Sequence, residues 1–121
     1  MSAARRVLVA EDDADIRRAL AFFLEAEGYE VLQAADGHEA IRHVRERSPF
    51  LVLMDRWMPG LNAEGYCRER TRDPHLAKVP VVLLSADSEA RRVADELGAQ
   101  GVLSKPISFD ALLTTVERFR V

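Results

Sequence analysis

The sequence lacks several features that would place it in particular classes of protein. It has a single cysteine, Cys67, so no internal disulfide can form and the fold does not depend on an oxidising compartment. No apolar run approaches the roughly 20 residues of a membrane span, and the N-terminal residues lack the apolar segment of a signal peptide. We therefore expect a cytoplasmic protein with no membrane contact.

An excess of basic charge is also missing. The formal net charge is -3 at pH 7, with both signs spread along the chain, whereas a nucleic-acid surface usually shows a basic stripe. The arginine pairs at 17–18 and 91–92 are typical of solvated helix faces, so we expect no direct nucleic-acid binding. The 121 residues contain no repeat, low-complexity tract or linker, which predicts one domain over residues 1–121.

Two periodicities alternate along the chain. Short apolar runs rich in branched residues are typical of strands buried on both faces of a parallel sheet, and they occupy residues 7–10, 31–34, 50–54, 81–84 and 101–103. Helical stripes lie between and after them, at about 14–27, around 40–44, near 66–72, at 90–97 and around 112–119. Five strand–helix repeats with right-handed crossovers predict an α/β fold, a doubly wound parallel sheet with five helices on both faces.

Polar residues gather where the predicted strands end. In doubly wound sheets, ligands bind outside the carboxyl ends of the strands, so these positions carry the functional prediction. They are Glu11, Asp12 and Asp13 after the first strand, Asp55 after the third, Ser85 after the fourth and Lys105-Pro106 after the fifth.

These residue types fit the chemistry of phosphoryl transfer. Clustered carboxylates repel one another unless a cation or a proton offsets the repulsion. Carboxylate oxygens are suitable ligands for magnesium. An aspartate can also act as a nucleophile and form an acyl phosphate. Transfer requires neutralisation of the phosphoryl oxygens, which a metal, an ammonium and a hydroxyl supply. Taken singly each residue has a plainer interpretation, and Asp13 in particular is more typical of a helix cap.

The chain resembles the receiver domains of two-component response regulators over essentially its whole length. Four stretches carry the resemblance: VLVAEDD at 7–13, LMDRWMPG at 53–60, VLLSA at 82–86 and LSKP at 103–106. The resemblance implies a flavodoxin-like sheet of strand order 2-1-3-4-5, as in the chemotaxis regulators.

The resemblance also implies a metal site and a phosphoacceptor. Asp55 matches the phosphorylated aspartate, and Asp12 matches a direct ligand of Mg²⁺, which Mn²⁺ can replace. Glu11 matches an acidic neighbour that acts mainly through water, and Trp57 matches the residue whose main-chain carbonyl binds the metal.

Two further residues would bind the phosphoryl group. Ser85 matches the hydroxyl that contacts a phosphoryl oxygen after transfer, and Lys105 matches the amine that pairs with the phosphate. The peptide bond before Pro106 is expected to be cis, as is typical of such domains. Asp87 is expected to cap a helix, with a second role in placing water.

Four positions in three parts of the sequence depart from the family pattern. Val102 stands where the family usually has an aromatic ring that signals phosphorylation, and a short, stiff valine cannot reproduce that movement. Ala63 and Gly65 occupy a loop where the family places its glycine differently, so the start of the third helix is open. Trp57 replaces a residue that is commonly small or polar; it is either a partly exposed aromatic on the loop or a shield that protects the acyl phosphate from water.

The implied function is a signalling switch rather than an enzyme, a phosphoacceptor that assists its own phosphorylation and dephosphorylation. A sensor histidine kinase or phosphotransfer protein would donate the phosphate, and a downstream effector domain or protein would read the altered surface; homodimerisation on phosphorylation stays open. One alternative is a degenerate receiver that serves only as an interaction module. Another, an aspartate-nucleophile phosphatase, would need a carboxylate where Trp57 stands. A nucleotide- or flavin-binding module would need a glycine-rich loop after the first strand, where Glu11 and its acidic neighbours repel phosphate.

Overall fold

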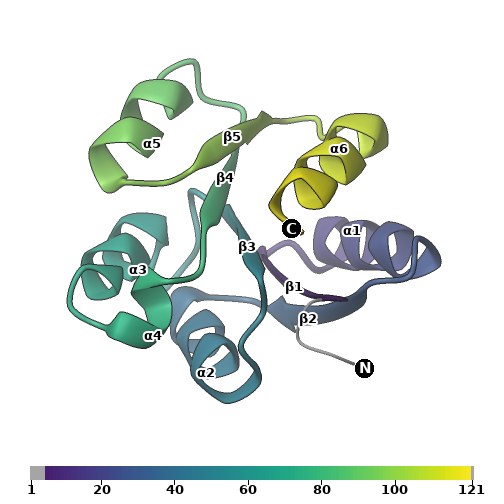
Figure 1. Cartoon of the computed structure of the whole chain (residues 1–121). Coiled ribbons are helices and arrows are strands. Elements are labelled where there is room, and N and C mark those ends of the chain that lie inside the picture. Colours follow the sequence, from purple (N-terminus) through teal and green to yellow (C-terminus); the bar gives the residue numbers. More distant parts are fainter. Residues whose placement is uncertain (1–4, 121) are drawn as a thin grey trace.

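A five-stranded parallel sheet lies between two layers of helices in the computed structural model, which describes residues 5–120 (Figure 1). The strands are β1 (Arg6–Ala10), β2 (Glu30–Ala34), β3 (Leu51–Asp55), β4 (Val81–Ser85) and β5 (Gly101–Ser104). Every neighbouring pair is parallel, and the strand order is β2-β1-β3-β4-β5. The predicted α/β class and strand order are therefore confirmed.

Helices cover both faces of the sheet. They are α1 (Ala14–Ala26), α2 (Gly37–Arg47), α3 (Ala63–Arg70), α4 (Pro74–Ala77), α5 (Ala90–Leu97) and α6 (Phe109–Phe119). Helices α1 and α6 lie together on one side of the sheet, and the other four lie on the opposite side (Figure 1). None of these helices, within the part of the chain that the structure describes, is long and apolar enough to cross a bilayer.

Alternating side chains of each strand build the two cores. Val7 and Val9 of β1 join the core under α1 and α6, whereas Leu8 and Ala10 join the core under the other helices. β1, β3 and β4 have neighbours on both sides and are almost completely buried, which is why their sequences are continuous apolar runs. The buried strands hold the ends of the sheet, and the residues that follow them, in fixed positions.

Side-chain caps set where the helices begin. The carboxylate of Asp13 accepts the backbone amides of Asp15 and Ile16 at the start of α1, as its cap interpretation predicted. Ser108 caps α6 through the amide of Ala111. Gly28, just after α1, has a φ of 94°, a left-handed conformation that suits the predicted helix stop.

One expectation about the helices was wrong. Residues 5–120 contain six helices rather than five, because the predicted third helix ends at Arg70 instead of about residue 72 and a separate helix of four residues, α4, follows. Asp73 caps α4 by accepting the amide of His75, and Pro74 occupies its first turn, where a missing amide costs nothing. Asp73 followed by Pro74 thus begins a helix here, whereas the sequence predicted only the end of one at this point.

The loop between β3 and α3 shows where the third helix begins, which the sequence left open. The side chain of Asn62 accepts the amide of Gly65, so α3 begins at Ala63. The carbonyl of Leu61 accepts the amide of Gly37 at 2.8 Å, and a Cβ on Gly37 would collide with that carbonyl. A Cβ on Gly65 would collide with the Leu61 side chain, so both glycines permit the close approach of this loop.

Two sequence-based expectations reach beyond the described residues. The prediction about the N-terminal segment rests partly on residues 1–4, and the single-domain prediction includes Val121. Those positions lie outside residues 5–120.

Candidate functional site

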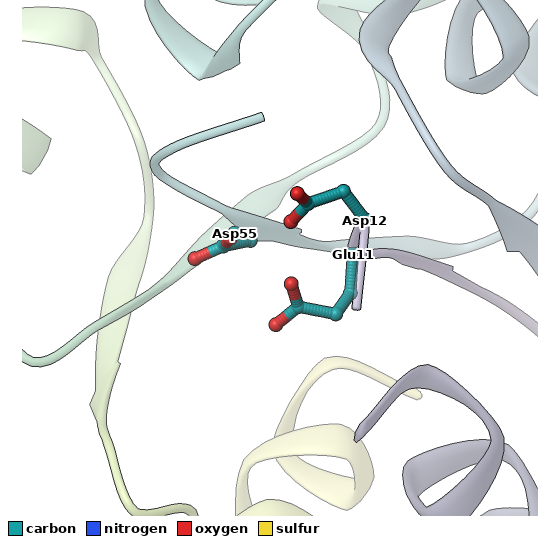
Figure 2. A group of neighbouring side chains, drawn as sticks. All are labelled: Glu11, Asp12 and Asp55. Carbon is teal, nitrogen blue, oxygen red and sulfur yellow. The ribbon is translucent and has the colours of Figure 1, made fainter. Parts of the chain in front are cut away.

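Three carboxylates converge at the carboxyl edge of the sheet. The last residue of β1, Ala10, pairs in register with Met54 of β3, so Glu11 and Asp12 emerge beside Asp55. One oxygen from each of these three carboxylates can be chosen so that all lie within 4.8 Å of one another. Figure 2 shows the three side chains reaching toward the same space from two strand ends. The structure thus brings together the acidic residues that the sequence singled out.

An ammonium group bridges two of the carboxylates. Nζ of Lys105 lies 2.9 Å from Oε1 of Glu11 and 2.9 Å from Oδ1 of Asp55. Glu11 is 1% exposed and Asp55 is 5% exposed, so both charges are largely removed from water and need a partner nearby. The Lys105–Pro106 peptide bond is cis, as expected, and the backbone amide of Lys105 donates to the carbonyl of Ser85.

The site shifts two pKa values in the same direction for different reasons. Burial raises the pKa of Glu11 from 4.5 to about 7, the hydrogen bond from Lys105 opposes the rise and the nearby charge of Asp55 adds to it. Burial alone would lower the pKa of Lys105, but its hydrogen bonds to Glu11 and Asp55 outweigh burial and raise that pKa. The amine is therefore charged at neutral pH, and Glu11 is poised between its two forms.

The hydroxyl of Ser85 lies at the end of β4, next to β3 in the sheet. Ser85 is 3% exposed, and its Oγ accepts the backbone amide of Asp87 at 3.0 Å. A hydroxyl that accepts one hydrogen bond can still donate its own hydrogen to another group. Asp55 pairs in register with Leu84, so Ser85 extends one residue beyond Asp55 along the neighbouring strand.

Asp87 differs in part from its predicted role. Its carboxylate accepts the amide of Glu89 at 2.8 Å, but α5 begins at Ala90, so Asp87 caps the turn that precedes the helix. Its other oxygen lies 2.6 Å from Nη1 of Arg56. The sequence alone assigns Arg56 no role, because its one signal is a pair of opposite charges, Arg56 and Asp87, placed after neighbouring strands.

Trp57 lies at the rim of the site. It is 57% exposed, and the guanidinium carbon of Arg56 lies 4.3 Å from the centroid of its indole ring. This contact agrees with a partly exposed aromatic on the loop. The role of the Trp57 main-chain carbonyl as a metal ligand stays a prediction.

The family model for the response regulator receiver domain matches residues 7–117. The chain belongs to this family. Receiver domains are phosphoacceptors of two-component signalling rather than conventional enzymes, and they bind Mg²⁺ in an acidic site and interact with histidine kinases and downstream effectors. In the described part of this chain, Glu11, Asp12 and Asp55 form an acidic cluster of the same kind.

A longer protein carries a segment similar to this receiver domain. It is 39% identical over 105 residues to a protein of Porphyridium aerugineum that carries the name transcriptional regulator ycf27. That alignment covers 85% of this chain but only 42% of the relative, so the relative is a much longer protein.

Solved structures share the fold closely. A structure from Chloroflexus aurantiacus, described as that of a response regulator, has a TM-score of 0.89 and 27% identity, covering 96% of this chain and 97% of the other. The receiver domain of sensor histidine kinase PA1611 from Pseudomonas aeruginosa has a TM-score of 0.87 and 25% identity, covering 96% and 97%. That structure holds a magnesium ion in its active site cleft.

Proposed function

We propose that this receiver domain accepts a phosphoryl group on Asp55 from a histidine kinase or phosphotransfer protein and then alters its surface for a downstream effector. The contact of the Lys105 ammonium with both Glu11 and Asp55 carries this proposal. A buried aspartate held by an ammonium is suited to an acceptor whose product carries additional negative charge, and the two further carboxylates offer oxygen donors to a divalent cation. We further propose that residues 1–121 act as one domain in the cytoplasm.

The residues present fit a magnesium ion. The three carboxylates offer only oxygen donors, which Mg²⁺ prefers, and their mutual repulsion makes a divalent cation favourable there. Asp12, Asp55 and the main-chain carbonyl of Trp57 would hold the ion directly, and Glu11 would act mainly through water. When bound, Mg²⁺ supplies positive charge beside the phosphoryl oxygens, and Mn²⁺ can replace it.

Asp55, Lys105 and Ser85 each have a part in the transfer itself. A carboxylate oxygen of Asp55 forms the new bond to phosphorus while the bond from phosphorus to the donor histidine nitrogen breaks, and that nitrogen keeps the electron pair. Lys105 pairs its ammonium with the arriving phosphoryl oxygens, and Ser85 donates its hydroxyl hydrogen to one of them. Water later attacks the acyl phosphate, which releases inorganic phosphate and restores the Asp55 carboxylate.

Phosphorylation can be tested without the cognate kinase. Acetyl phosphate with Mg²⁺ should add the mass of one phosphoryl group to the intact protein, and hydroxylamine should remove it because the product is an acyl phosphate. Asp55→Asn should abolish the addition. Asp95→Asn is the matched control, because Asp95 is an exposed aspartate on α5, away from the cluster.

The same experiment separates the two leading functions. A degenerate receiver would gain no phosphoryl group from acetyl phosphate or from any histidine kinase tested, although the fold would be intact. That result would overturn the proposed function and leave an interaction module. Addition of phosphate to Asp95→Asn but not to Asp55→Asn would support it.

A further inference from the structure

A half-buried arginine connects the two strand ends that flank the site. Arg56 follows Asp55 directly, and its backbone amide donates to the carbonyl of Leu84 in β4. Its side chain is 12% exposed and pairs with Asp87 at 2.6 Å and, more weakly, with Glu64 at 3.8 Å. The Arg56–Asp87 ion pair, which we call the loop latch, therefore ties the β3–α3 loop to the β4–α5 loop.

The loop latch is continuous with Ser85, whose hydroxyl is proposed above to bind the phosphoryl group. Asp87 uses its carboxylate to bind Arg56 and its backbone amide to bind Oγ of Ser85. While the ion pair holds Asp87, the amide that Ser85 contacts is held too. Movement of the Ser85 hydroxyl toward a phosphoryl group on Asp55 would separate Oγ from that amide, so the loop latch opposes this movement.

The arginine is not fully satisfied where it lies. Nε of Arg56 is buried and has no hydrogen-bond partner among residues 5–120. A buried donor without an acceptor is unfavourable, which offsets part of the stability of the ion pair.

We propose that Arg56, acting through Asp87, is a positioning residue that holds Ser85 in its phosphate-free orientation and so sets how readily the domain adopts its phosphorylated conformation. This inference rests on the proposed roles of Asp55 and Ser85. Arg56 acts through the loop latch and does not itself react. Opening the loop latch shifts the population toward the phosphorylated conformation before any phosphate arrives.

Asp87→Asn is the sharpest variant. The asparagine oxygen can still accept the amide of Glu89, so the turn before α5 is retained while the charge that pairs with Arg56 is lost. We expect the affinity for beryllofluoride, measured in the presence of Mg²⁺ by the fluorescence of Trp57, to rise by up to about fivefold, the upper range for such ion pairs.

Asp73→Asn provides a matched control. Asp73 also binds an arginine, Arg45, at 2.6 Å and also accepts the amide two residues later, that of His75. It precedes β4 and so lies at the opposite edge of the sheet from the site. Neutralising Asp73 should leave the affinity for beryllofluoride unchanged.

A second readout separates opening of the loop latch from a simple change of charge. In Arg56→Gln, with no beryllofluoride present, the amide resonance of Asp87 should lie part-way between its free and beryllofluoride-bound positions in the wild type. Loss of a cation alone weakens anion binding but does not move this population. In the Arg56→Gln background, Asp87→Asn should raise beryllofluoride affinity less than it does in the wild type.

Failure of the loop latch and failure of Asp55 phosphorylation would give different results. If wild-type protein binds no beryllofluoride, the proposed function fails. If the wild type binds it but Asp87→Asn binds no more tightly, or Arg56→Gln leaves the Asp87 resonance at its free position, the loop latch is overturned and phosphorylation of Asp55 stands.

Discussion

Nζ of Lys105 lies 2.9 Å from Oδ1 of Asp55, although 50 residues separate them in sequence. The same nitrogen lies 2.9 Å from Oε1 of Glu11. In the absence of a metal ion, this one ammonium is the cation that the described residues place against both buried carboxylates. The site thus carries its own counter-charge, which a divalent cation would supplement.

Lys105→Met should destabilise the metal-free domain and make it more dependent on magnesium. Removing the ammonium leaves two buried carboxylates without their cation, and we expect the free energy of unfolding to fall by about 1–3 kcal/mol. Because Mg²⁺ offers an alternative counter-charge, added Mg²⁺ should raise the melting temperature of the variant more than that of the wild type. Urea unfolding and thermal melts with and without Mg²⁺ measure both effects.

The only other lysine provides the control for that experiment. Lys78 is exposed at the end of α4, so Lys78→Met should change the free energy of unfolding little. Equal stability losses in the two variants, or equal responses to Mg²⁺, would contradict the role assigned to Lys105.

Glu11 should make the domain less stable as the pH rises. Burial raises its pKa from 4.5 to about 7 in the folded chain, so between these values the folded state holds a proton that the unfolded state releases. The free energy of unfolding should therefore fall as pH rises from about 4.5 to 7, by up to about 3 kcal/mol.

Comparison with Glu11→Gln isolates this contribution from other titrating groups. The stability of the wild type relative to Glu11→Gln should decrease between about pH 4.5 and pH 7. Mg²⁺ should restore more of it at the higher pH, because the ion favours the charged carboxylate. A pH-independent difference between the two proteins would exclude the raised pKa.

The fluorescence of Trp57 should report the site directly. Trp57 is the single tryptophan, two residues beyond Asp55, and its ring packs against Arg56, so changes at the strand end alter its surroundings. We expect one intensity change with Mg²⁺ and a second with beryllofluoride. The second should vanish in Asp55→Asn and persist in Asp95→Asn; a silent wild-type spectrum that accompanies proven phosphorylation would refute this expectation.

Trp57→Asn tests whether the indole also protects the acyl phosphate. We expect the variant to lose its phosphate faster, because a small polar side chain leaves the rim of the site more open to water. The measurement is the decay of phosphoprotein after removal of acetyl phosphate. An unchanged rate would leave the ring as an exposed aromatic stacked on Arg56.

Tyr66→Phe should stabilise the domain slightly or leave its stability unchanged. Tyr66 is fully buried in α3, and its hydroxyl has no hydrogen-bond partner among residues 5–120. Removing an unsatisfied hydroxyl avoids a desolvation cost, so the free energy of unfolding should rise by up to about 1 kcal/mol. A loss of more than about 1 kcal/mol in urea unfolding would show that this hydroxyl has a partner.

The apolar patterns predicted most of the fold because burial dictates them. Strands buried on both faces must be continuously apolar, and their ends and order then follow from short connections and right-handed crossovers. Helix α4 escaped prediction because four residues cannot display a helical stripe. Its signal in the sequence was Asp73 followed by Pro74, which fits the end of the preceding helix equally well.

The candidate site, too, was only partly predictable from the sequence. The gathering of Glu11, Asp12 and Asp55 could be predicted because topology alone brings the ends of parallel strands together. The Arg56–Asp87 ion pair could not, since it depends on the paths of two loops and the rotamer of a long side chain. The raised pKa of Glu11 likewise needs the burial that only the folded chain defines.

The contact between Glu11 and Lys105 spans 94 residues, and this separation bears on how the protein is made. During synthesis from the N-terminus, Glu11, Asp12 and Asp55 leave the ribosome before Lys105 does, because the lysine follows the last strand. A nascent chain that has not yet produced β5 would gather carboxylates without their ammonium, so premature docking of β1 against β3 would be disfavoured by repulsion. The final strand therefore completes the sheet and also brings in the ammonium that balances the buried carboxylates.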